Sequence, residues 1–584
     1  PSPSLPLPPL ITSFPIFYSS TYTSALYRNL VTVRPLSADV MAVGNELSSE
    51  TGAVIRVLAV DSLADLNVVT RAASLGGLEI HGAVVPAVLM RDMSECARCA
   101  SSGLEPVDNF VFSTSMLAAQ TLLPPTRHMF SIGGKMRAVP LSLSLVTLLV
   151  RTDVAPRGTQ PIATLDDLIS EAFAVNGTDM NGDGLGDFAI CLAPSLGYGP
   201  VTTLMGVLAP VLQLHGSSQG AFFDEATLQP LFNTEGARKG LDLFLSLAAF
   251  ADLVAPPTTE ATQAAIRSGA CAFIIGPPMV AAANASRFRK EYMFQAMPGV
   301  DTAYSRSAQR MVDCSVPAPN TGGPAPCPHA AAGVSAAPVY GVGGWGGAMY
   351  AHVSAAGKSL GLELFARLAL VQRLNVDPAL AVLFRSDVAS GAWTARGLPP
   401  LLASSLEATV DSGFAHLNAV RPLNIFRSLA YMDELWEQVF RSVTGDVGTE
   451  VAQLDLQAAW TLLTNEVGRD KQATAYAEVL HPEQFIGGPA PQSSAPIPVG
   501  IVVGAVVSVV VGALCCAGLG LIAMRRRGAS ARVVPNSPVL YKFEVADVDA
   551  IDYSELTVIR TVGMGSFGEV FLARWRDSDV AVKR

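Results

Sequence analysis

An uncharged apolar run at residues 499–524, VGIVVGAVVSVVVGALCCAGLGLIAM, most limits what this chain can fold into. The run holds no proline and is long enough to cross a bilayer as a helix. A core helix of a globular domain is seldom apolar on every face. The arginines 525–527 follow directly, whereas the preceding flank GGPAPQSSAPIP carries no charge. The positive-inside rule therefore predicts a single-pass membrane protein with its C-terminal side in the cytoplasm and the residues before 499 outside.

Small residues recur at every fourth position of this run and would form a stripe on one helix face. The stripe consists of Gly500, Gly504, Ser508, Gly512, Cys516 and Gly520. Such stripes let two membrane helices approach closely, which predicts a homodimer through this face. The alternative is that small residues are simply common in membrane helices.

The composition of the part before the run agrees with an outer, oxidising location. Six of the eight cysteines lie there, at positions 96, 99, 191, 271, 314 and 327. Cys314 and Cys327 flank a Pro/Gly-rich loop and are predicted to pair, whereas Cys96 and Cys99 suit a disulfide or free thiols better than half of a zinc site. Sequons at Asn176 and Asn284 fit a glycoprotein. The net charge of -10, without a long basic run, argues against a nucleic-acid partner.

The C-terminal residues contain a glycine pattern with strand-like sequence on both sides. Gly563, Gly565 and Gly568 give G-x-G-x-x-G, and LTVIRTV before them and EVFLARW after them favour strands. A third strand, VAVK, ends at Lys583. Glycines of this kind present backbone N–H groups to phosphates. The alternative is a glycine-rich hairpin without a function.

From about residue 553 onward, YSELTVIRTVGMGSFGEVFLARW and DVAVK resemble the start of a protein kinase domain of the tyrosine-kinase-like serine/threonine group. The resemblance implies that Lys583 grips the phosphates of ATP, with Mg²⁺ in a complete kinase, and that the substrate is protein. The catalytic loop would lie beyond Arg584, so this chain alone should be inactive. It also begins with PSPSLP, and both ends suggest a fragment of a longer product. The ATP-binding residues implied are Val562, Gly563, Gly565, Ser566, Phe567, Gly568, Val570, Ala581 and Lys583.

Residues 52–484 make up most of the chain and read as alternating strands and helices. The run VIRVLAV near their start predicts a buried strand, and helical patterns alternate with short apolar strands after it. This alternation favours an α/β architecture with parallel strands. More than 400 residues exceed what one core holds, so two lobes are expected.

Four segments in order, RAVPLSLSLVTLLVRTDV, TLDDLISEAFAVNGTDMNGDGLGDFAI, AAIRSGACAFIIGPPM and YGVGGWGGAMYAHVSAAGKSLGLELFARLAL, resemble extracellular solute-binding proteins of the sugar-binding type (family 1). The resemblance implies two lobes joined by crossing strands, which close by a hinge on a small, carbohydrate-like ligand. By position it implies that Trp345 stacks on the ligand, with Ser142 and Ser144 nearby. A core role for Trp345 is the alternative. Leu141 replaces the family's tyrosine after the proline.

The acidic turn DMNGDGLGD has the spacing of a calcium loop. Asp179, Asn181, Asp183 and Asp187 occupy four of the ligand positions, but Ile190 stands where the bidentate glutamate belongs. An EF-hand is therefore excluded. A structural turn is favoured over a looser Ca²⁺ site, and no other metal or catalytic motif precedes the membrane.

The sequence thus predicts a receptor-like protein kinase whose outer domain senses a ligand. An alternative is a membrane-anchored solute-capture protein with an inactive or absent kinase, and a third class is an adhesion or scaffold protein. The predicted division is an irregular region at 1–51, a solute-binding-like domain at 52–484, a Pro/Gly/Ser-rich linker at 485–498, the membrane helix at 499–524, a basic juxtamembrane segment at 525–552 and the truncated kinase start at 553–584.

Overall fold

The computed structural model describes most of the chain up to residue 485 and three strands near its end. The described residues are 27–60, 62–74, 80–95, 103–113, 125–192, 198–251, 253, 264–265, 268–276, 291–316, 325–375, 389–395, 397–485, 557–565, 568–575 and 578–583. The chain divides into two compact units, Pro1–Pro489 and Ala490–Arg584, and each is described by itself.

The first sheet of the larger unit has the order β2-β1-β3-β13-β6. Its strands are β1 (Tyr27–Val33), β2 (Val54–Val60), β3 (Gly82–Pro86), β6 (Val139–Pro140) and β13 (Trp345–Met349). β1 runs parallel to β2 and β3, whereas β13 is antiparallel to β3 and β6. Every residue of β3 and β13 is buried, because these strands lie at the centre of the sheet.

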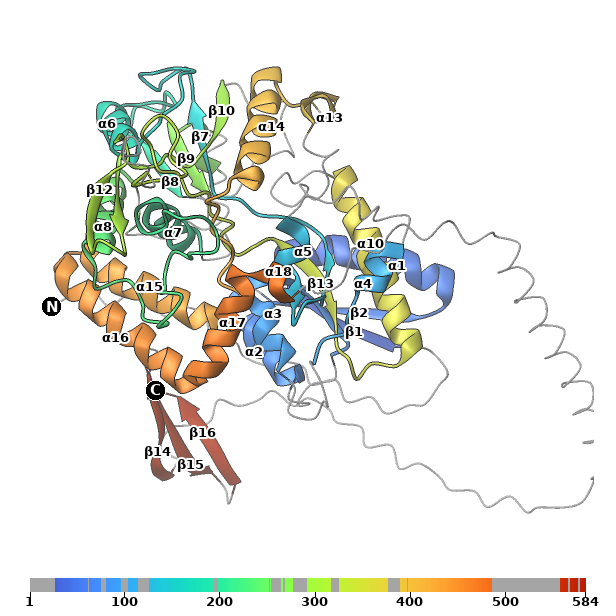
Figure 1. Ribbon diagram of the computed structural model, residues 1–584. Coiled ribbons are helices and arrows are strands. Elements are labelled where there is room, and N and C mark those ends of the chain that lie inside the picture. The colour runs from blue at the N-terminus through green and yellow to red at the C-terminus, as the bar shows by residue number, and fades with distance from the viewer. Residues whose placement is uncertain are drawn as a thin grey trace, which may run out of the picture. The chain divides into compact units, whose positions relative to one another are not determined.

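Helices α1 (Arg34–Thr51), α2 (Leu63–Ser74) and α10 (Ala355–Asn375) accompany this sheet (Figure 1). α1 contacts both β2 and α10. A Cβ added at Gly44 of α1 would lie 3.3 Å from Ile55 and 3.7 Å from Leu364, so the glycine permits this close approach. Helices packed on a sheet with parallel strands confirm the predicted α/β class.

Two expectations about the beginning of the chain are wrong. Residues 27–51 are not irregular: they form β1 and α1, and Val31 of β1 is fully buried. The apolar spacing Val40, Val43, Leu47 along α1 was the available signal for this amphipathic helix. β2 is a strand as predicted but not a buried one, because it lies at the sheet edge and alternates between exposed and half-buried residues.

The second sheet has the order β10-β7-β9-β8. Its strands are β7 (Thr147–Arg151), β8 (Ile190–Leu192), β9 (Phe273–Gly276) and β10 (Tyr292–Ala296). Helices α6 (Leu165–Val175), α7 (Gly199–Leu212) and α8 (Glu235–Ala248) belong to this half (Figure 1). α6 begins with a capping box, in which Thr164 accepts a hydrogen bond from the backbone of Asp167 and Asp167 accepts one from the backbone of Thr164.

Three chain segments lie side by side between the two sheets. The first, residues 141–146, leads from β6 to β7, and the second, residues 337–344, leads into β13. The third, residues 416–427, leads from α14 to α15. Val146 N donates to Val339 O at 2.8 Å, and Val420 N donates to Pro338 O at 2.7 Å. The chain therefore passes between two lobes more than once, which confirms the predicted two-lobed architecture.

The C-terminal part of the larger unit contains the helices α14 (Pro400–Ala415), α15 (Ser428–Val443), α16 (Thr449–Val467) and α17 (Arg469–Leu480). Trp460 of α16 lies at the centre of an aromatic cluster with Phe222, Phe223, Phe232 and Tyr431. The shorter elements are β4 (Ser131–Ile132), β5 (Lys135–Met136), β11 (Thr302–Ser305), β12 (Arg310–Asp313), η1 (Ala87–Leu89), α3 (Met90–Ser94), α4 (Asp108–Ser113), α5 (Pro125–Met129), α13 (Ser390–Ala395) and α18 (Pro482–Phe485).

Two disulfides join described residues of this unit. Cys314 pairs with Cys327, as predicted, and Cys191 pairs with Cys271 across a sequence separation of 80. Cys96 and Cys99 lie outside the described residues.

Removing the Cys314–Cys327 disulfide, which closes the shorter of the two loops, is expected to destabilise the larger unit. A Cys314→Ala/Cys327→Ala variant should lose about 3 kcal/mol of unfolding free energy, because the bridge no longer restricts the unfolded chain. Denaturant unfolding of the full chain under oxidising conditions measures this loss. Strong reductant should lower the stability of the parent protein and change the variant less; equal sensitivity would contradict a stabilising role for this bridge.

The second unit contains an antiparallel sheet of β14 (Thr557–Gly565), β15 (Gly568–Trp575) and β16 (Ser578–Lys583). These strands confirm the three predicted strands, whereas Gly563 and Gly565 lie within β14. Gly565 pairs with Gly568, and Val570 pairs with Lys583. The predicted membrane helix and its small-residue stripe lie outside the described residues; within the described part of the chain, no helix is both long and apolar enough to span a bilayer.

Candidate functional site

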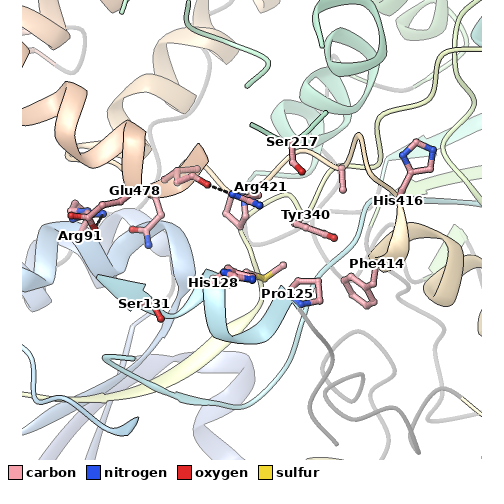
Figure 2. Close-up of a pocket in the computed structure, with 15 residues that line it drawn as sticks. Arg91, Pro125, His128, Ser131, Ser217, Tyr340, Phe414, His416, Arg421 and Glu478 are labelled. Carbon is pink, nitrogen blue, oxygen red and sulfur yellow. Dashed lines mark hydrogen bonds and ion pairs between the residues drawn. The ribbon is translucent and has the colours of Figure 1, made fainter. Parts of the chain in front are cut away.

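A cavity of about 160 Å³ lies in the larger unit beside the segments that join the two lobes (Figure 2). Its walls come from α3, α5 and β4 of one lobe, from α14 and the residue Ser217 after α7, from the joining segments and from α17. The lining residues are Arg91, Pro125, His128, Met129, Ser131, Ser217, Tyr340, Phe414, His416, Ala419, Arg421, Pro422, Asn424, Glu478 and Val479.

Local hydrogen bonds and ring packing place the aromatic wall of this cavity. Tyr340 N donates to Val420 O at 3.1 Å, which fixes the second joining segment against the third. The rings of Tyr340 and Phe414 lie with centroids 5.4 Å apart. Burial raises the pKa of the Tyr340 hydroxyl, so the group stays neutral and can donate or accept a hydrogen bond.

Arg421 is the central cation of the site. Its Nη1 donates to Val479 O and Leu480 O, both at 2.7 Å, at the C-terminal end of α17. Such carbonyls carry the negative end of the helix dipole and stabilise a cation. Burial lowers the pKa of Arg421, and Glu483 opposes this from a distance. A guanidinium nevertheless remains charged in proteins, so Arg421 brings a positive charge to the cavity wall.

The second arginine of the site is neutralised by an ion pair. Arg91 Nη2 lies 2.9 Å from Glu478 Oε2, and only 6% and 13% of the two side chains are exposed. The same carboxylate oxygen accepts from Gly133 N at 2.9 Å. The guanidinium of Arg91 also lies 5.7 Å from the ring centroid of Phe426. Because Glu478 accepts hydrogen bonds from Arg91 and Gly133, its negative charge offsets the positive charge of Arg91.

Besides Arg91 Nε, two polar side chains of the lining have buried atoms without partners among the described residues. Asn424 is 5% exposed, and its Oδ1 accepts no hydrogen bond there. His128 Nδ1 is likewise buried without a partner. Burial lowers the pKa of His128, and the charge of Arg421 lowers it further. Buried polar atoms in native proteins nearly always find a partner, so these two indicate a site for a polar ligand or water.

The histidines of the site predict a loss of stability in mild acid. Burial lowers the pKa of both His128 and His416 from the ordinary value of 6.5. The unfolded chain takes up these protons near that value, whereas the folded chain does so only at lower pH. These histidines therefore do not lower the free energy of unfolding above about pH 6.5. This free energy falls as the pH drops toward their pKa values in the folded chain, by about 1 kcal/mol for each group and each unit by which its pKa is lowered.

Thermal unfolding of the full chain from about pH 7.5 to about pH 5 tests this expectation. The double variant His128→Gln/His416→Gln should show a smaller fall in melting temperature than the parent protein. A fall of the same size in both proteins would assign the acid sensitivity to other groups.

Of the ligand residues implied by the resemblance, Ser142 and Ser144 lie on the first joining segment and Trp345 at the start of β13, and none of them lines this cavity. Trp345 begins β13 and is 8% exposed, and its N donates to Ser142 Oγ at 3.1 Å. Trp345 O accepts from the backbone N of Leu141 and of Ser142. Ser144 is buried in the first segment. These hydrogen bonds join the start of β13 to the first joining segment. Contact of Trp345 and Ser142 with a ligand stays a prediction.

The acidic turn uses its carboxylates to bind its own backbone. Asp179 accepts from the N atoms of Gly182, Asp183 and Gly184, and these hydrogen bonds lower its pKa. Asp187 Oδ2 accepts from Met180 N at 2.8 Å. This geometry supports the structural turn. Among the described residues, no group of three or more His, Cys, Asp or Glu side chains could hold a metal ion.

Sequence reasoning missed Arg421, Asn424, His128 and Tyr340. Arg421 and Asn424 stand in the stretch AVRPLNIF, where a turn is indicated by the proline but a ligand site is not. The four residues come from segments almost 300 positions apart, and no local pattern joins them.

No protein-family model and no curated protein matches this chain. Solved structures do match its fold. An ABC transporter solute binding protein from Agrobacterium radiobacter in complex with ribitol has a TM-score of 0.55 and 16% identity, covering 75% of this chain and 98% of its own. A protein of the same description from Agrobacterium vitis with bound D-mannitol has a TM-score of 0.52 and 15% identity, covering 76% and 99%. Maltose-bound MalE3 from T. maritima has a TM-score of 0.52 and 14% identity, covering 75% and 100%.

The prediction that this protein is a kinase, and so an enzyme, is wrong. The proteins that match about three quarters of the chain are solute-binding proteins, and no kinase family model matches it. The glycines misled because a hairpin needs them too: Gly565 and Gly568 pair at the end of β14 and the start of β15. Nucleotide binding by the predicted residues stays a prediction, and Ser566 and Phe567 lie outside the described residues.

These likenesses, all at low identity, concern the fold alone. The match covers 98% and 100% of the length of the ribitol-bound and the maltose-bound protein. Over about three quarters of its length, this chain has the two-lobed fold of ABC transporter solute-binding proteins.

Proposed function

We propose that this chain captures a small polyhydroxylated solute at the junction of its two lobes and is held at a membrane by residues 499–524. The observation that carries the proposal is the polar cavity beside the joining segments, in a fold shared with proteins that hold ribitol, mannitol and maltose. The cavity offers aromatic rings, hydrogen-bond donors and unpartnered acceptors, which are the groups that bind hydroxylated molecules.

The position of the cavity couples binding to the arrangement of the lobes. Tyr340 and Asn424 come from the joining segments, whereas His128 comes from α5 of the first lobe. A ligand that contacts all three favours one lobe arrangement over others, by as much as its affinity differs between them. Capture is therefore accompanied by a hinge movement.

The membrane anchor rests on the sequence. Residues 499–524 are uncharged and the arginines 525–527 follow, which supports a single-pass helix with the lobes outside the cell. Carbonate extraction tests the anchor, and protease protection in sealed vesicles tests the orientation. Release by carbonate, or digestion of residues 528–584 in place of the lobes from the outer side, would contradict the respective part of the proposal.

Binding is tested with the full chain in lipid nanodiscs. Calorimetric titration with ribitol, D-mannitol, D-ribose and maltose should give saturable binding of at least one compound. Hydrogen exchange of residues 337–344 should slow in the presence of that compound, because Tyr340 of this segment lines the site. If none of these compounds, nor any monosaccharide acid, binds saturably, the capture function is wrong and a scaffold role is favoured.

A further inference from the structure

The charges around the cavity do not balance, and this points to the kind of solute that it holds. Of the lining residues, Arg91 and Arg421 are cations and Glu478 is an anion. Glu478 is paired with Arg91 at 2.9 Å. Among the described residues, Arg421 has only backbone carbonyls as hydrogen-bond partners. One positive charge therefore remains among the lining residues, and Glu483, whose side chain is 61% exposed, acts on it only from a distance.

Arg421 keeps donors available for a ligand. Its two hydrogen bonds both come from Nη1, which leaves Nη2 and Nε outside the described hydrogen bonds. A guanidinium binds a carboxylate with two parallel N–H···O bonds. The hold on Val479 O and Leu480 O also fixes the plane of the guanidinium before a ligand arrives, so less side-chain entropy is lost on binding.

Asn424 and His128 of the cavity wall require hydrogen-bond donors from a ligand and not a negatively charged group. Asn424 Oδ1 and His128 Nδ1 are buried without partners among the described residues. The lowered pKa of His128 keeps its ring neutral, so one ring nitrogen can accept. Hydroxyl groups satisfy both atoms, whereas a carboxylate would be repelled by the amide oxygen.

The size of the cavity limits the ligand to one sugar unit. A volume of about 160 Å³ is small for a ligand pocket, for which about 300 Å³ is a usual lower bound. An oligosaccharide would not fit, whereas a compound with a short carbon chain suits a site that adjusts by hinge movement.

We propose that the solute is a hydroxylated carboxylate of a single sugar unit, such as an aldonic or uronic acid, whose carboxylate binds Arg421 and whose hydroxyls bind Asn424 and His128. This inference rests on the proposed capture function and specifies its substrate class. A neutral polyol would fill the same space but would leave the half-buried guanidinium of Arg421 without a paired anion among the lining residues.

The test compares two compounds that differ at one carbon. Calorimetric titration of the full chain in nanodiscs should show D-ribonate binding at least about tenfold more tightly than ribitol, a difference of about 1.4 kcal/mol. Arg421→Gln should reduce ribonate affinity to about that of ribitol, while ribitol affinity changes by less than about twofold. Acetate, a carboxylate without hydroxyls, should bind far more weakly than ribonate.

The outcomes separate this inference from the capture function. If ribitol or mannitol binds as tightly as the acid or more tightly, the acid specificity is wrong and the capture function stands. If acetate equals ribonate, the site is a simple anion site and the inference fails. If Arg421→Gln does not fold, the comparison in the parent protein still decides, and Arg421→Lys, which keeps the charge but not the planar fork, should bind ribonate with intermediate affinity.

Discussion

Replacing Gly344 by alanine is expected to lower the free energy of unfolding of the larger unit by about 4 kcal/mol. Gly344 has a φ of +84°, in the left-handed region that favours glycine. A Cβ at this position would clash with Ser142 O and would lie 2.7 Å from Leu143 Cα. Both obstacles are backbone atoms of the first joining segment, so neither can move without parting the two segments. Thermal and denaturant unfolding of the full chain in detergent measure the effect.

Gly397→Ala is the matched control for this prediction. Gly397 also has a positive φ, +92°, but nothing lies within 4 Å of an added Cβ. This variant carries backbone strain alone and should lose about 1 kcal/mol. Equal losses in the two variants would show that close approach of the joining segments contributes nothing, and the role assigned to Gly344 would be wrong.

Trp460→Ala should cost about 4 kcal/mol of unfolding free energy, because it empties the centre of an aromatic cluster. Trp460 is 1% exposed, and its Nε1 donates to Tyr431 O at 3.0 Å. Its ring centroid lies 4.7 Å from that of Phe232 and 5.0 Å from that of Phe223. The substitution removes these contacts and leaves a buried carbonyl with one partner fewer.

Leu462→Ala on the same helix provides the comparison. Leu462 is 60% exposed, so its truncation should change the free energy of unfolding by less than about 0.5 kcal/mol. Both variants are measured by denaturant unfolding with circular dichroism, since removal of Trp460 changes the tryptophan fluorescence. A small loss for Trp460→Ala would mean that the cluster collapses into the space and that α16 is not held by this residue.

Gly344→Ala and Trp460→Ala probe different consequences of the fold. Trp460 holds α16 in the aromatic cluster, whereas Gly344 sets how closely the first two joining segments approach. A Gly344→Ala protein that remains folded should also bind its solute less well, because the segments carry Tyr340 and the contact of Val339 with Val420. Gly344→Ala would then lower both stability and solute binding, whereas Trp460→Ala would lower stability without lowering binding.

Features that depend on neighbours in the sequence were predictable. The strands of the C-terminal hairpin follow from short patterns and formed where the sequence placed them. The Cys314–Cys327 bridge was also accessible, because 13 positions and a Pro/Gly-rich loop separate the two cysteines. The order of α/β segments led to the two-lobed fold, since alternating strands and helices have few ways to bury their apolar faces.

Functional assignment from the same local patterns was less secure. A glycine spacing that suits a phosphate-binding loop also suits a tight hairpin, because both need backbone without a Cβ. The kinase assignment therefore followed from a real structural signal and still failed. β1 was overlooked for the opposite reason: its short apolar stretch gains meaning only when β2 and β3 pair with it on either side.

By itself the sequence determined the C-terminal strands, the α/β class, the two lobes and the apolar run at 499–524, because each depends on local composition, periodicity or length. Only the tertiary structure decided the site. Arg91, His128, Tyr340, Arg421 and Glu478 meet in one cavity although they are spread along the chain, and the pairing of Arg91 with Glu478 is what leaves Arg421 as the remaining charge. Such a balance of charges depends on which side chains the fold buries side by side, and no spacing along the chain records it.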